Sequence, residues 1–472
     1  MSRYTAVTDA DREAMLATIG VSSLEELFDG QIPDGVRLQG GLDLPDGMPE
    51  QEVYAHLLDL ARKNTSAEDE ITFLGAGMYD HYVPAMIDML LGRSEFLTPY
   101  TPYQPEVSQG GLQVMFEYQT AICELTGLDI SNASVYEGPS AVAAAGYLAK
   151  LANKRPRYLV SAGLHPDSRQ TLETLSVGYG TEVVEIPLKD GATDVDALRE
   201  MLSDEVSAVV FQQPNFLGAI EDVQALSDAA HEVGALSICQ ADPISLGVLE
   251  APGRQGVDVC VGEGQTLGNR LDFGGPSFGF FAATTEHTRR MPGRIAGETV
   301  DGDGRRGFVL TLQTREQHIR REKATSNICT SQALNALAGV VYLGWLGRDG
   351  LVELGELLVQ RTHYARQVLT GLDGVTALHD QPVVREFAIR LPDDVTTADV
   401  ISLCQDRGVN PGFDLGRVRP EWEGGLLVAL TEQRSRDHID RLADVLAEAI
   451  AAARDGEGRA TSPILSSVGG AA

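Results

Sequence analysis

Covalent chemistry on a carbonyl compound needs an amine such as that of lysine, and few positions in this chain can provide one. The sequence of 472 residues contains five lysines, Lys63, Lys150, Lys154, Lys189 and Lys323. None of them lies in the segment VGEGQTLG, residues 261–268, at the end of a predicted strand. Gln265 and Thr266 in this segment offer an amide and a hydroxyl, which bind through hydrogen bonds but form no imine.

An acidic residue precedes that segment. Asp242 follows the apolar run ALSIC, residues 235–239, which predicts a buried strand. In the large α/β class of pyridoxal-phosphate enzymes, an acidic residue after such a strand pairs with the pyridinium nitrogen, and a lysine further along holds the cofactor. Gln265 and Thr266 stand at that later place, so we predict a vestigial pocket around Asp242 and Gln265 with no catalytic lysine. A simpler interpretation makes Asp242 a turn or capping residue.

Two further segments place polar and aromatic side chains beside rigid backbone. Pro102 and Pro105 disfavour a helix in YTPYQPE, residues 100–106, which predicts an extended loop. The side chains that this loop would present are Tyr100, Thr101, Tyr103 and Gln104. In EKATSNICTSQA, residues 322–333, Thr325 or Ser326 could cap the following helix, with Asn327 beside them. Such loops are common at binding sites, but a packed connecting loop is an equally good interpretation of the first segment.

Other kinds of site are excluded or left open by the pattern. The nine histidines and five cysteines show no HExxH motif, CxxC pair or other metal-ligand spacing, so we expect no metal site. The loop GEGQTLG, residues 262–268, lacks the glycine spacing and the following helix of a dinucleotide-binding loop. Basic residues predominate between 305 and 323, which indicates either a solvated helix face or a patch for an anionic ligand or acidic partner.

The composition is that of a large acidic globular protein. The formal net charge is −31, and only five of the 37 basic residues are lysine. Such a polyanion repels nucleic-acid phosphates, and an acidic, lysine-poor surface would suit a cytoplasm of very high salt. No apolar run approaches the ~20 residues of a membrane span, and the polar start is unlike a secretory signal. Scattered cysteines fit a reduced protein, so we expect a cytoplasmic location.

The apolar pattern predicts an α/β fold. Short β-branched or apolar runs alternate with helical patterns from about residue 70 to 290, which favours a mostly parallel sheet with helices on both faces. After Thr325 we expect a long helical stretch to about Leu369, and then a smaller α/β segment. The predicted parts are a helical arm and linker (1–95), a large α/β domain (96–330), long helices with a small C-terminal α/β domain (331–455), and a disordered tail (456–472).

Long stretches of the sequence resemble the P-protein of the glycine cleavage system, glycine dehydrogenase (decarboxylating), in its two-subunit form, and within it subunit 1 (alpha). They include FLGAGMYDHYVPAMID and VGEGQTLGNRLDFGGPSFGFF. The resembling segments span residues 17–28, 73–88, 100–134, 212–222, 242–247, 261–281 and 290–338. The resemblance that includes these segments extends over nearly the full length of the chain.

The resemblance implies a type I pyridoxal-phosphate transferase fold. It also implies that a second subunit carries the lysine and the covalently bound cofactor, so that this chain would be the non-lysine subunit of a heterodimer or α2β2 complex. The implied reaction takes glycine, releases CO2 and passes the aminomethyl group to the lipoyl arm of the H-protein. We expect Tyr100–Gln104 and Thr325–Asn327 to face subunit 2 and to help form its cofactor site.

The sequence also departs from the family pattern near the vestigial pocket. Glu137, Pro139 and Ser140 replace an aspartate-glycine-alanine-threonine-like run, and Gln240 precedes Asp242. Two other functions stay open at this point. One is an independent pyridoxal-phosphate enzyme, such as an aminotransferase or desulfurase, which would have to recruit one of the five lysines, with Lys323 the least implausible. The other is a non-enzymatic scaffold.

Overall fold

The computed structural model describes residues 6–38, 40–324 and 328–456, and the chain divides into two compact units, Met1–Thr65 and Ser66–Ala472. The helices of the first unit are α1 (Asp9–Ile19), α2 (Leu24–Asp29) and α3 (Glu50–Ala61). Thr8 caps α1 in a capping box with Asp11, and Ser23 caps α2. None of these three helices buries a residue, so this arm has no core of its own.

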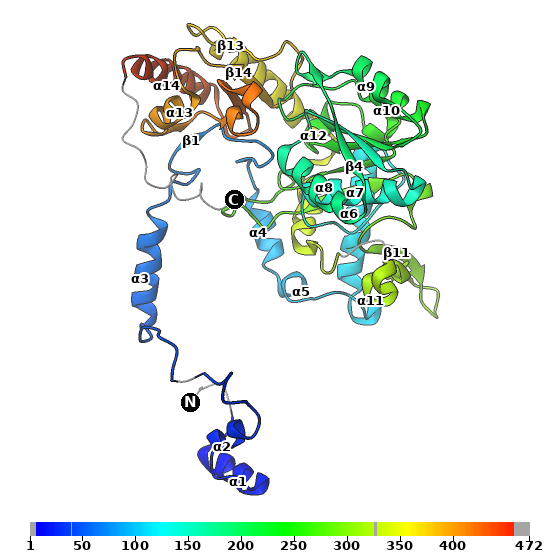
Figure 1. Cartoon of the computed structure of the whole chain (residues 1–472), viewed down its shortest axis with the longest axis vertical. Helices are drawn as coiled ribbons and strands as arrows, with labels where there is room; N and C mark the ends of the chain where they lie inside the picture. Colours follow the sequence, from blue (N-terminus) through cyan, green and yellow to red (C-terminus); the bar gives the residue numbers. More distant parts are fainter. Residues whose placement is uncertain (1–5, 39, 325–327, 457–472) are drawn as a thin grey trace. The chain divides into compact units, whose positions relative to one another are not determined.

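The second unit is built on a seven-stranded sheet in the order β2-β10-β9-β8-β7-β3-β4 (Figure 1). Its strands are β2 (Ile130–Ser131), β3 (Arg157–Ser161), β4 (Glu182–Ile186), β7 (Val206–Gln213), β8 (Leu236–Ala241), β9 (Val259–Glu263) and β10 (Gly279–Ala283). The five strands from β9 to β4 are parallel, and β10 is antiparallel to both of its neighbours. The predicted α/β fold with a mostly parallel sheet is therefore confirmed.

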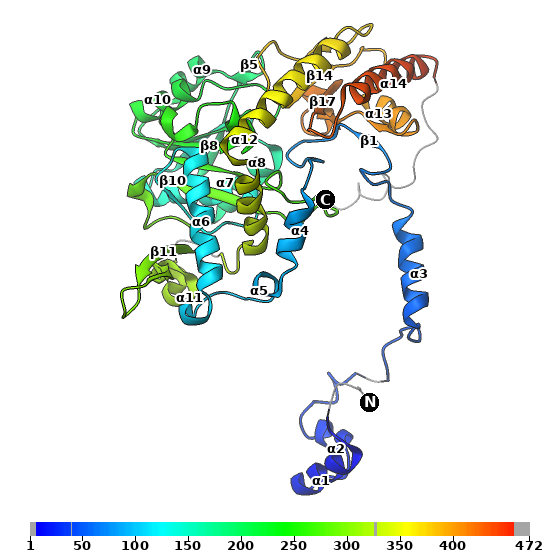
Figure 2. The same ribbon diagram turned by 180° about the vertical axis from the view of Figure 1, so that it is seen from behind.

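Helices cover both faces of this sheet because alternate strand residues point to opposite sides. On β7, Ala208 and Val210 pack with the apolar residues of α7 and α8, whereas Val209 and Phe211 pack with those of α6, α10 and α12. Figure 1 shows the first face and Figure 2 the second. The helices are α6 (Gln109–Thr126), α7 (Gly138–Asn153), α8 (Pro166–Gly178), α9 (Val195–Met201), α10 (Val223–Glu232) and α12 (Ala333–Leu369).

A smaller antiparallel sheet, in the order β13-β14-β17-β16, follows α12. Its strands are β13 (Thr376–Ala377), β14 (Glu386–Arg390), β16 (Phe413–Asp414) and β17 (Gly425–Ala429), with α13 (Thr397–Gln405) and α14 (Arg436–Arg454) packed beside it. The short strand β1 (Ile71–Thr72) pairs with β15 (Val409–Asn410), and Phe73 is buried in this second core. The segment after residue 70 is thereby fixed against the C-terminal part of the chain.

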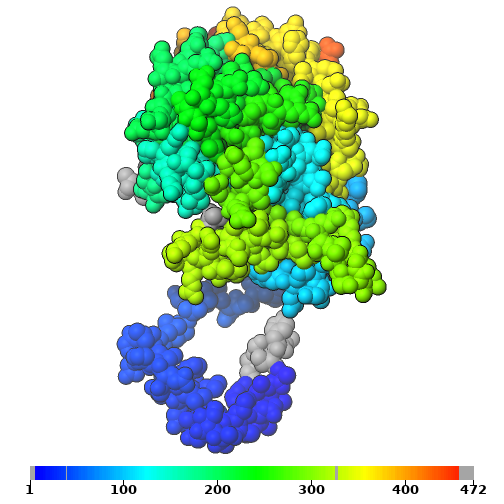
Figure 3. All heavy atoms as spheres, turned by 90° about the vertical axis from the view of Figure 1, so that its right-hand side faces the viewer, coloured from blue at the N-terminus to red at the C-terminus, as the bar shows by residue number. Residues whose placement is uncertain are grey.

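Shorter elements complete the second unit. They are α4 (Ala85–Leu91), α5 (Ser94–Leu97), the pair β5 (Leu188–Lys189) and β6 (Ala192–Thr193), the hairpin β11 (Ile295–Val300) and β12 (Arg306–Thr311), and α11 (Gln317–Arg320). The hairpin packs on α6 through Phe308 and Phe116, whose ring centroids lie 5.4 Å apart. In the space-filling view of Figure 3 the hairpin and the residues after it form a continuous band next to α6. The predicted division of this unit at residues 95 and 330 stays a prediction.

One predicted boundary is wrong. The long helix was expected to start soon after Lys323, but α12 begins at Ala333 with Gln332 as its N-cap residue. Ser331 has a φ of 52°, which a right-handed helix cannot accommodate, so the helix cannot extend towards residue 328. Thr325, Ser326 and Asn327 themselves lie outside the described residues, as does almost all of the predicted tail.

Candidate functional site

Asp242 lies just after β8, at the edge of the sheet where the parallel strands end and where α/β folds place their ligands. One oxygen of its carboxylate pairs with Nη2 of Arg385 at 2.7 Å, and the other accepts a hydrogen bond from the Ser245 hydroxyl at 2.5 Å. The guanidinium of Arg385 lies over the Tyr79 ring, 3.6 Å from its centroid. The carboxylate therefore already has a buried cation as its partner.

Gln265 fills the place that the sequence assigns to a lysine. Its side chain is fully buried, and it accepts from the backbone N–H of Tyr79 while donating to the Tyr79 and Asn269 carbonyls, at 2.9–3.0 Å. The amide thus ties the segment around Tyr79 to the end of β9. Thr266 lies beside it with its hydroxyl buried and without a hydrogen-bond partner among the described residues. Gln265 acts here as a structural link and has no free group for a ligand.

The N-terminus of α7 opens onto the same edge of the sheet. Free N–H groups at a helix N-terminus ordinarily attract anions such as phosphate. Here the Glu137 carboxylate accepts from the N–H of Ser140 at 2.9 Å, and the Glu263 carboxylate accepts from the N–H of Gly138 at 2.9 Å. Gly138 allows this approach, because a Cβ at this position would lie 3.1 Å from the backbone nitrogen of Glu263. The protein's own carboxylates therefore occupy this anion site.

Glu263 is the most perturbed acid of this group. Burial raises the pKa of Glu263 to about 7, against hydrogen bonds from Gly138, Ser277 and Gln265 that act to lower it, and the neighbouring Glu137 carboxylate adds to the rise. The Ser277 hydroxyl donates to the same carboxylate. Near neutral pH this group therefore exchanges between its acid and its carboxylate form.

Two adjoining cavities lie around these residues. The one bordered by Asp242, Gln240, Thr266 and Arg385 has a volume of about 40 Å³, and the one bordered by Glu137, Glu263 and His165 has a volume of about 400 Å³. Binding sites for small organic ligands usually measure ~300–1,000 Å³, so the space next to Asp242 is too small for a pyridine ring. None of the five lysines borders either cavity.

Pyridoxal phosphate therefore does not fit the residues of this pocket. The acid that would meet the ring nitrogen is paired with Arg385, the helix N-terminus carries carboxylates in place of a phosphate, and no amine is available. The chain brings the predicted residues Asp242, Gln265 and Thr266 together, but around a nearly filled space. These side chains provide no amine that would hold the cofactor covalently.

The predicted loop at residues 100–104 presents a different surface. Backbone without regular structure runs to Gln104 and ends in a 3-10 turn at Pro105–Val107, where proline is tolerated in the first position. Tyr100 is 74% exposed and Tyr103 is 49% exposed, Gln104 is exposed and Thr101 is half-buried. An apolar cavity of about 540 Å³ lies between this loop and the starts of α6 and α12.

Behind the loop lies a buried cation. Arg294 is 2% exposed, its Nε has no hydrogen-bond partner among the described residues, and its Nη2 donates to the Tyr103 hydroxyl over 3.4 Å. The ring of Tyr103 also contacts the ring of His318 edge-on, with centroids 5.7 Å apart. Tyr103 is therefore held from below by two side chains while half of its surface stays exposed.

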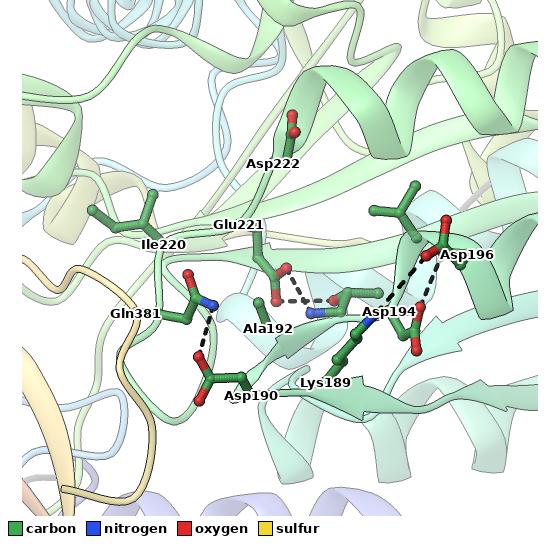
Figure 4. Close-up of a pocket in the computed structure, with 11 residues that line it drawn as sticks. Lys189, Asp190, Ala192, Asp194, Asp196, Ile220, Glu221, Asp222 and Gln381 are labelled. Atoms are coloured by element: carbon green, nitrogen blue, oxygen red, sulfur yellow. Dashed lines mark hydrogen bonds and ion pairs between the residues drawn. The ribbon is translucent and has the colours of Figure 1, made fainter.

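A fourth cavity, of about 520 Å³, is bordered by the acidic side chains of Asp190, Asp194, Asp196, Glu221 and Asp222 (Figure 4). Three of these carboxylates already accept hydrogen bonds from neighbouring groups of the fold. Glu221 accepts from the N–H and hydroxyl of Thr193, Asp194 caps α9, and Asp190 accepts from the side chain of Gln381. Among the described residues no three His, Cys, Asp or Glu side chains are grouped to hold a metal ion, and no helix is long and apolar enough to cross a membrane.

Solved structures place this fold in a known class. The chain is similar to a sphingosine-1-phosphate lyase of Burkholderia pseudomallei (TM-score 0.64, 16% identity, 91% of this chain and 96% of that chain). It is also similar to a glutamate decarboxylase of Lactobacillus brevis (TM-score 0.69, 14% identity, 89% and 96%). These likenesses show the fold alone, which is the type I fold of pyridoxal-phosphate-dependent enzymes.

Closer relatives define the family. Residues 2–446 match the family described as glycine cleavage system P-protein, and the chain belongs to this family. It is 49% identical to the "Probable glycine dehydrogenase (decarboxylating) subunit 1" of Moorella thermoacetica, over 93% of this chain and 98% of the relative. It is also 49% identical to the protein of the same name from Carboxydothermus hydrogenoformans, over 94% and 99%.

A solved structure of this family is similar over nearly the full length. The crystal structure of glycine decarboxylase (P-protein) of the glycine cleavage system in inhibitor-bound form has a TM-score of 0.87 and 43% identity, over 95% of this chain and 100% of that chain. The family resemblance stated from the sequence is therefore confirmed.

Sequence reasoning missed several residues of the pocket. Arg385 and Tyr79 are far from Asp242 in the sequence, and nothing in their local pattern marks them as its neighbours. Glu263 lies inside the segment that we singled out, but its role at the start of α7 depends on a contact across the sheet edge. Glu137 and Gln240 did stand out as departures from the family pattern, and both border the larger cavity.

Proposed function

We propose that this chain is the non-lysine subunit of a heteromeric glycine decarboxylase, the P-protein of the glycine cleavage system. The complex would act as glycine dehydrogenase (aminomethyl-transferring), releasing CO2 from glycine and passing the aminomethyl group to the lipoyl arm of the H-protein. The observation that carries this proposal is the filled pocket, in which Gln265 is bonded to the backbone and Asp242 is paired with Arg385. A chain with this pocket cannot hold the cofactor covalently by itself.

The partner would be subunit 2, which binds pyridoxal phosphate through its own lysine. The relatives' name "subunit 1" supports a second subunit. The arm in residues 1–65 supports it too, because it exposes many large apolar side chains that a partner could cover. Examples are Val36, Leu38, Leu42, Leu44 and Tyr54. All five cysteines are free thiols, which suits the cytoplasmic location that we propose for the complex.

We propose that the surface around the loop at residues 100–104 is the part of this chain that helps form the cofactor site of subunit 2. Tyr100 and Tyr103 are exposed aromatic side chains on rigid backbone next to an apolar cavity, and such residues dominate the energetics of protein interfaces. Thr101 and Gln104 add polar groups, and we propose the same role for Thr325, Ser326 and Asn327. These residues would help shape the site around glycine, while the partner supplies the amine.

Purification of the two subunits tests the proposal. The isolated chain should be colourless, and it should carry no pyridoxyl group after borohydride reduction. The complex should be yellow, carry the reduced cofactor on subunit 2 only, and catalyse glycine–bicarbonate exchange. A yellow isolated chain with a labelled lysine would favour an independent pyridoxal-phosphate enzyme. A complex without exchange activity would favour a scaffold.

A further inference from the structure

The larger cavity beside the vestigial pocket has an unusual set of walls. The acidic side chains that border its 400 Å³ are Glu137, Asp167 and Glu263, and among the described residues no lysine or arginine borders it. The His165 ring beside them is neutral, because its Nδ1 accepts from the Asp167 N–H while its Nε2 donates to the Ala76 carbonyl. Hydrogen-bond acceptors and negative charge therefore exceed donors and positive charge. Such a space repels phosphate and favours a cation.

A second observation points to a ligand. Gln240 is 6% exposed, it borders both cavities, and its Oε1 is buried without a hydrogen-bond partner among the described residues. The Thr266 hydroxyl, in a residue 3% exposed, is likewise without a partner and borders the smaller cavity. Buried polar groups without partners are rare in proteins, because each loses its hydrogen bonds to water. Gln240 Oε1 lacks a hydrogen-bond donor among the described residues, and a bound ligand would supply one.

We propose that this cavity binds a small protonated primary amine. Its ammonium group would lie among the carboxylates of Glu263 and Glu137 and donate a hydrogen bond to Gln240 Oε1, while its carbon chain would occupy the remaining volume. An ammonium group has three N–H donors, which matches the excess of acceptors. The pocket has thus changed its preference from an anionic cofactor to a cationic ligand. The proposal does not depend on which subunit holds pyridoxal phosphate.

Calorimetric titration of the full chain, alone and in its complex, tests the proposal with ethylammonium chloride at constant ionic strength. We expect saturable binding of ethylammonium at one site, at least about tenfold weaker binding of tetramethylammonium, which lacks N–H donors, and no binding of inorganic phosphate. Equal affinities for the two cations, or no binding of either, would overturn the proposal. Glycine–bicarbonate exchange by the complex is measured separately, so that failure of the proposed function is distinguishable.

Variants locate the site. Glu263→Gln keeps the size of the side chain and should weaken ethylammonium binding about tenfold or more, as loss of a charged hydrogen-bond partner does. Gln240→Leu should weaken binding as well, while Asp196→Asn, in the other acidic cavity, should leave it unchanged. Circular dichroism and thermal melting verify that each variant is folded. If Glu263→Gln and Gln240→Leu both fold and bind ethylammonium with unchanged affinity, the cavity is not the site.

Discussion

The vestigial pocket and the loop at residues 100–104 belong to the same unit, but they differ in how their charged groups are paired. In the pocket, Asp242 is paired with Arg385, Gln265 is bonded to the backbone, and the helix N-terminus of α7 carries the protein's own carboxylates. On the loop, Tyr100 and Tyr103 are exposed, and Arg294 lies buried beneath without an acidic partner among the described residues. Both regions keep buried polar atoms without partners among the described residues, such as Thr266 Oγ1 in the pocket, but only the pocket pairs its buried arginine with a carboxylate.

This difference indicates that the pocket acts as a structural element of the fold. A carboxylate and a helix N-terminus that would bind a cofactor leave strong unsatisfied groups when that cofactor is absent. Arg385 and Glu263 now meet most of those needs, so the pocket contributes to folding. The loop has kept exposed apolar surface instead, which is the property of an interface.

Removal of the Arg385 charge should destabilise the chain most. Arg385→Met leaves the carboxylate of Asp242 without its cation in a buried site, and loss of one partner of a buried pair costs about 3–5 kcal/mol. Chemical denaturation of the isolated chain measures this. Arg454→Met is the control, because the partners of Arg454 are exposed and its loss should have no measurable effect. Similar stabilities of the two variants would mean that the pocket is not a structural element.

Glu263 should make stability depend on pH. Its pKa is about 7 in the folded chain and near 4.5 when unfolded, so the folded state binds more protons between these values. The stabilising effect of its proton is complete below pH 4.5 and lost as pH rises to 7. Because part of the Glu263 side chain faces the cavity, we expect the free energy of unfolding to fall by an amount on the order of 2 kcal/mol over this pH range.

The test is the difference between the wild type and Glu263→Gln in free energy of unfolding, followed from pH 4.5 to 8. The charged and titratable groups that face Glu263 across the two cavities and the core are the same in both proteins: Glu137, Asp167, His165, Asp242, Arg385, Tyr79 and Tyr118. Their contributions therefore largely cancel in the difference. A difference that stays constant with pH would show that Glu263 is not perturbed.

Truncation of a side chain on the loop at residues 100–104 should affect binding to subunit 2 and not the folding of this chain. Tyr103→Ala should weaken binding to subunit 2 by about 2 kcal/mol, or roughly 30-fold, as loss of an interface aromatic does. Turnover of the complex should fall, and Asn327→Ala should lower it too, while the folding free energy of the chain changes little. Val177→Ala, at an exposed position on α8, is the control. Unchanged kinetics in both Tyr103→Ala and Asn327→Ala would remove this loop from the partner's site.

The smallest effect is expected at Gln104. This side chain is exposed and forms no hydrogen bond within the described part of the chain, so Gln104→Ala should leave folding unchanged. Loss of one polar contact at the edge of an interface should weaken subunit binding by about 0.5–1 kcal/mol, or roughly two- to fivefold. Surface plasmon resonance with immobilised subunit 2 measures this. A loss larger than that of Tyr103→Ala would reverse our ranking of aromatic over polar contacts.

The alternation of apolar residues was sufficient to predict the sheet and its covering helices. Runs such as those of β7 and β8 are short, rich in valine and isoleucine, and separated by helical patterns, and local periodicity alone determines these elements. The start of α12 was predicted too early, because the positive φ of Ser331 is a property of the folded backbone and not of the residue type. Asp242 and Gln265 could be singled out from chain order alone, and their assignment to a vestigial cofactor site stays a prediction.

By itself the sequence determined that Gln265 and Thr266, and not a lysine, stand where a cofactor lysine would, while only the fold shows that none of the five lysines borders the pocket. It also determined the family, because long segments carry that resemblance. Only the tertiary structure decided that the pocket is filled, because Arg385 and Tyr79 come from loops remote from Asp242 in the chain. Ion pairs and helix N-termini act over a few ångströms in space, and sequence distance does not report which groups folding brings that close.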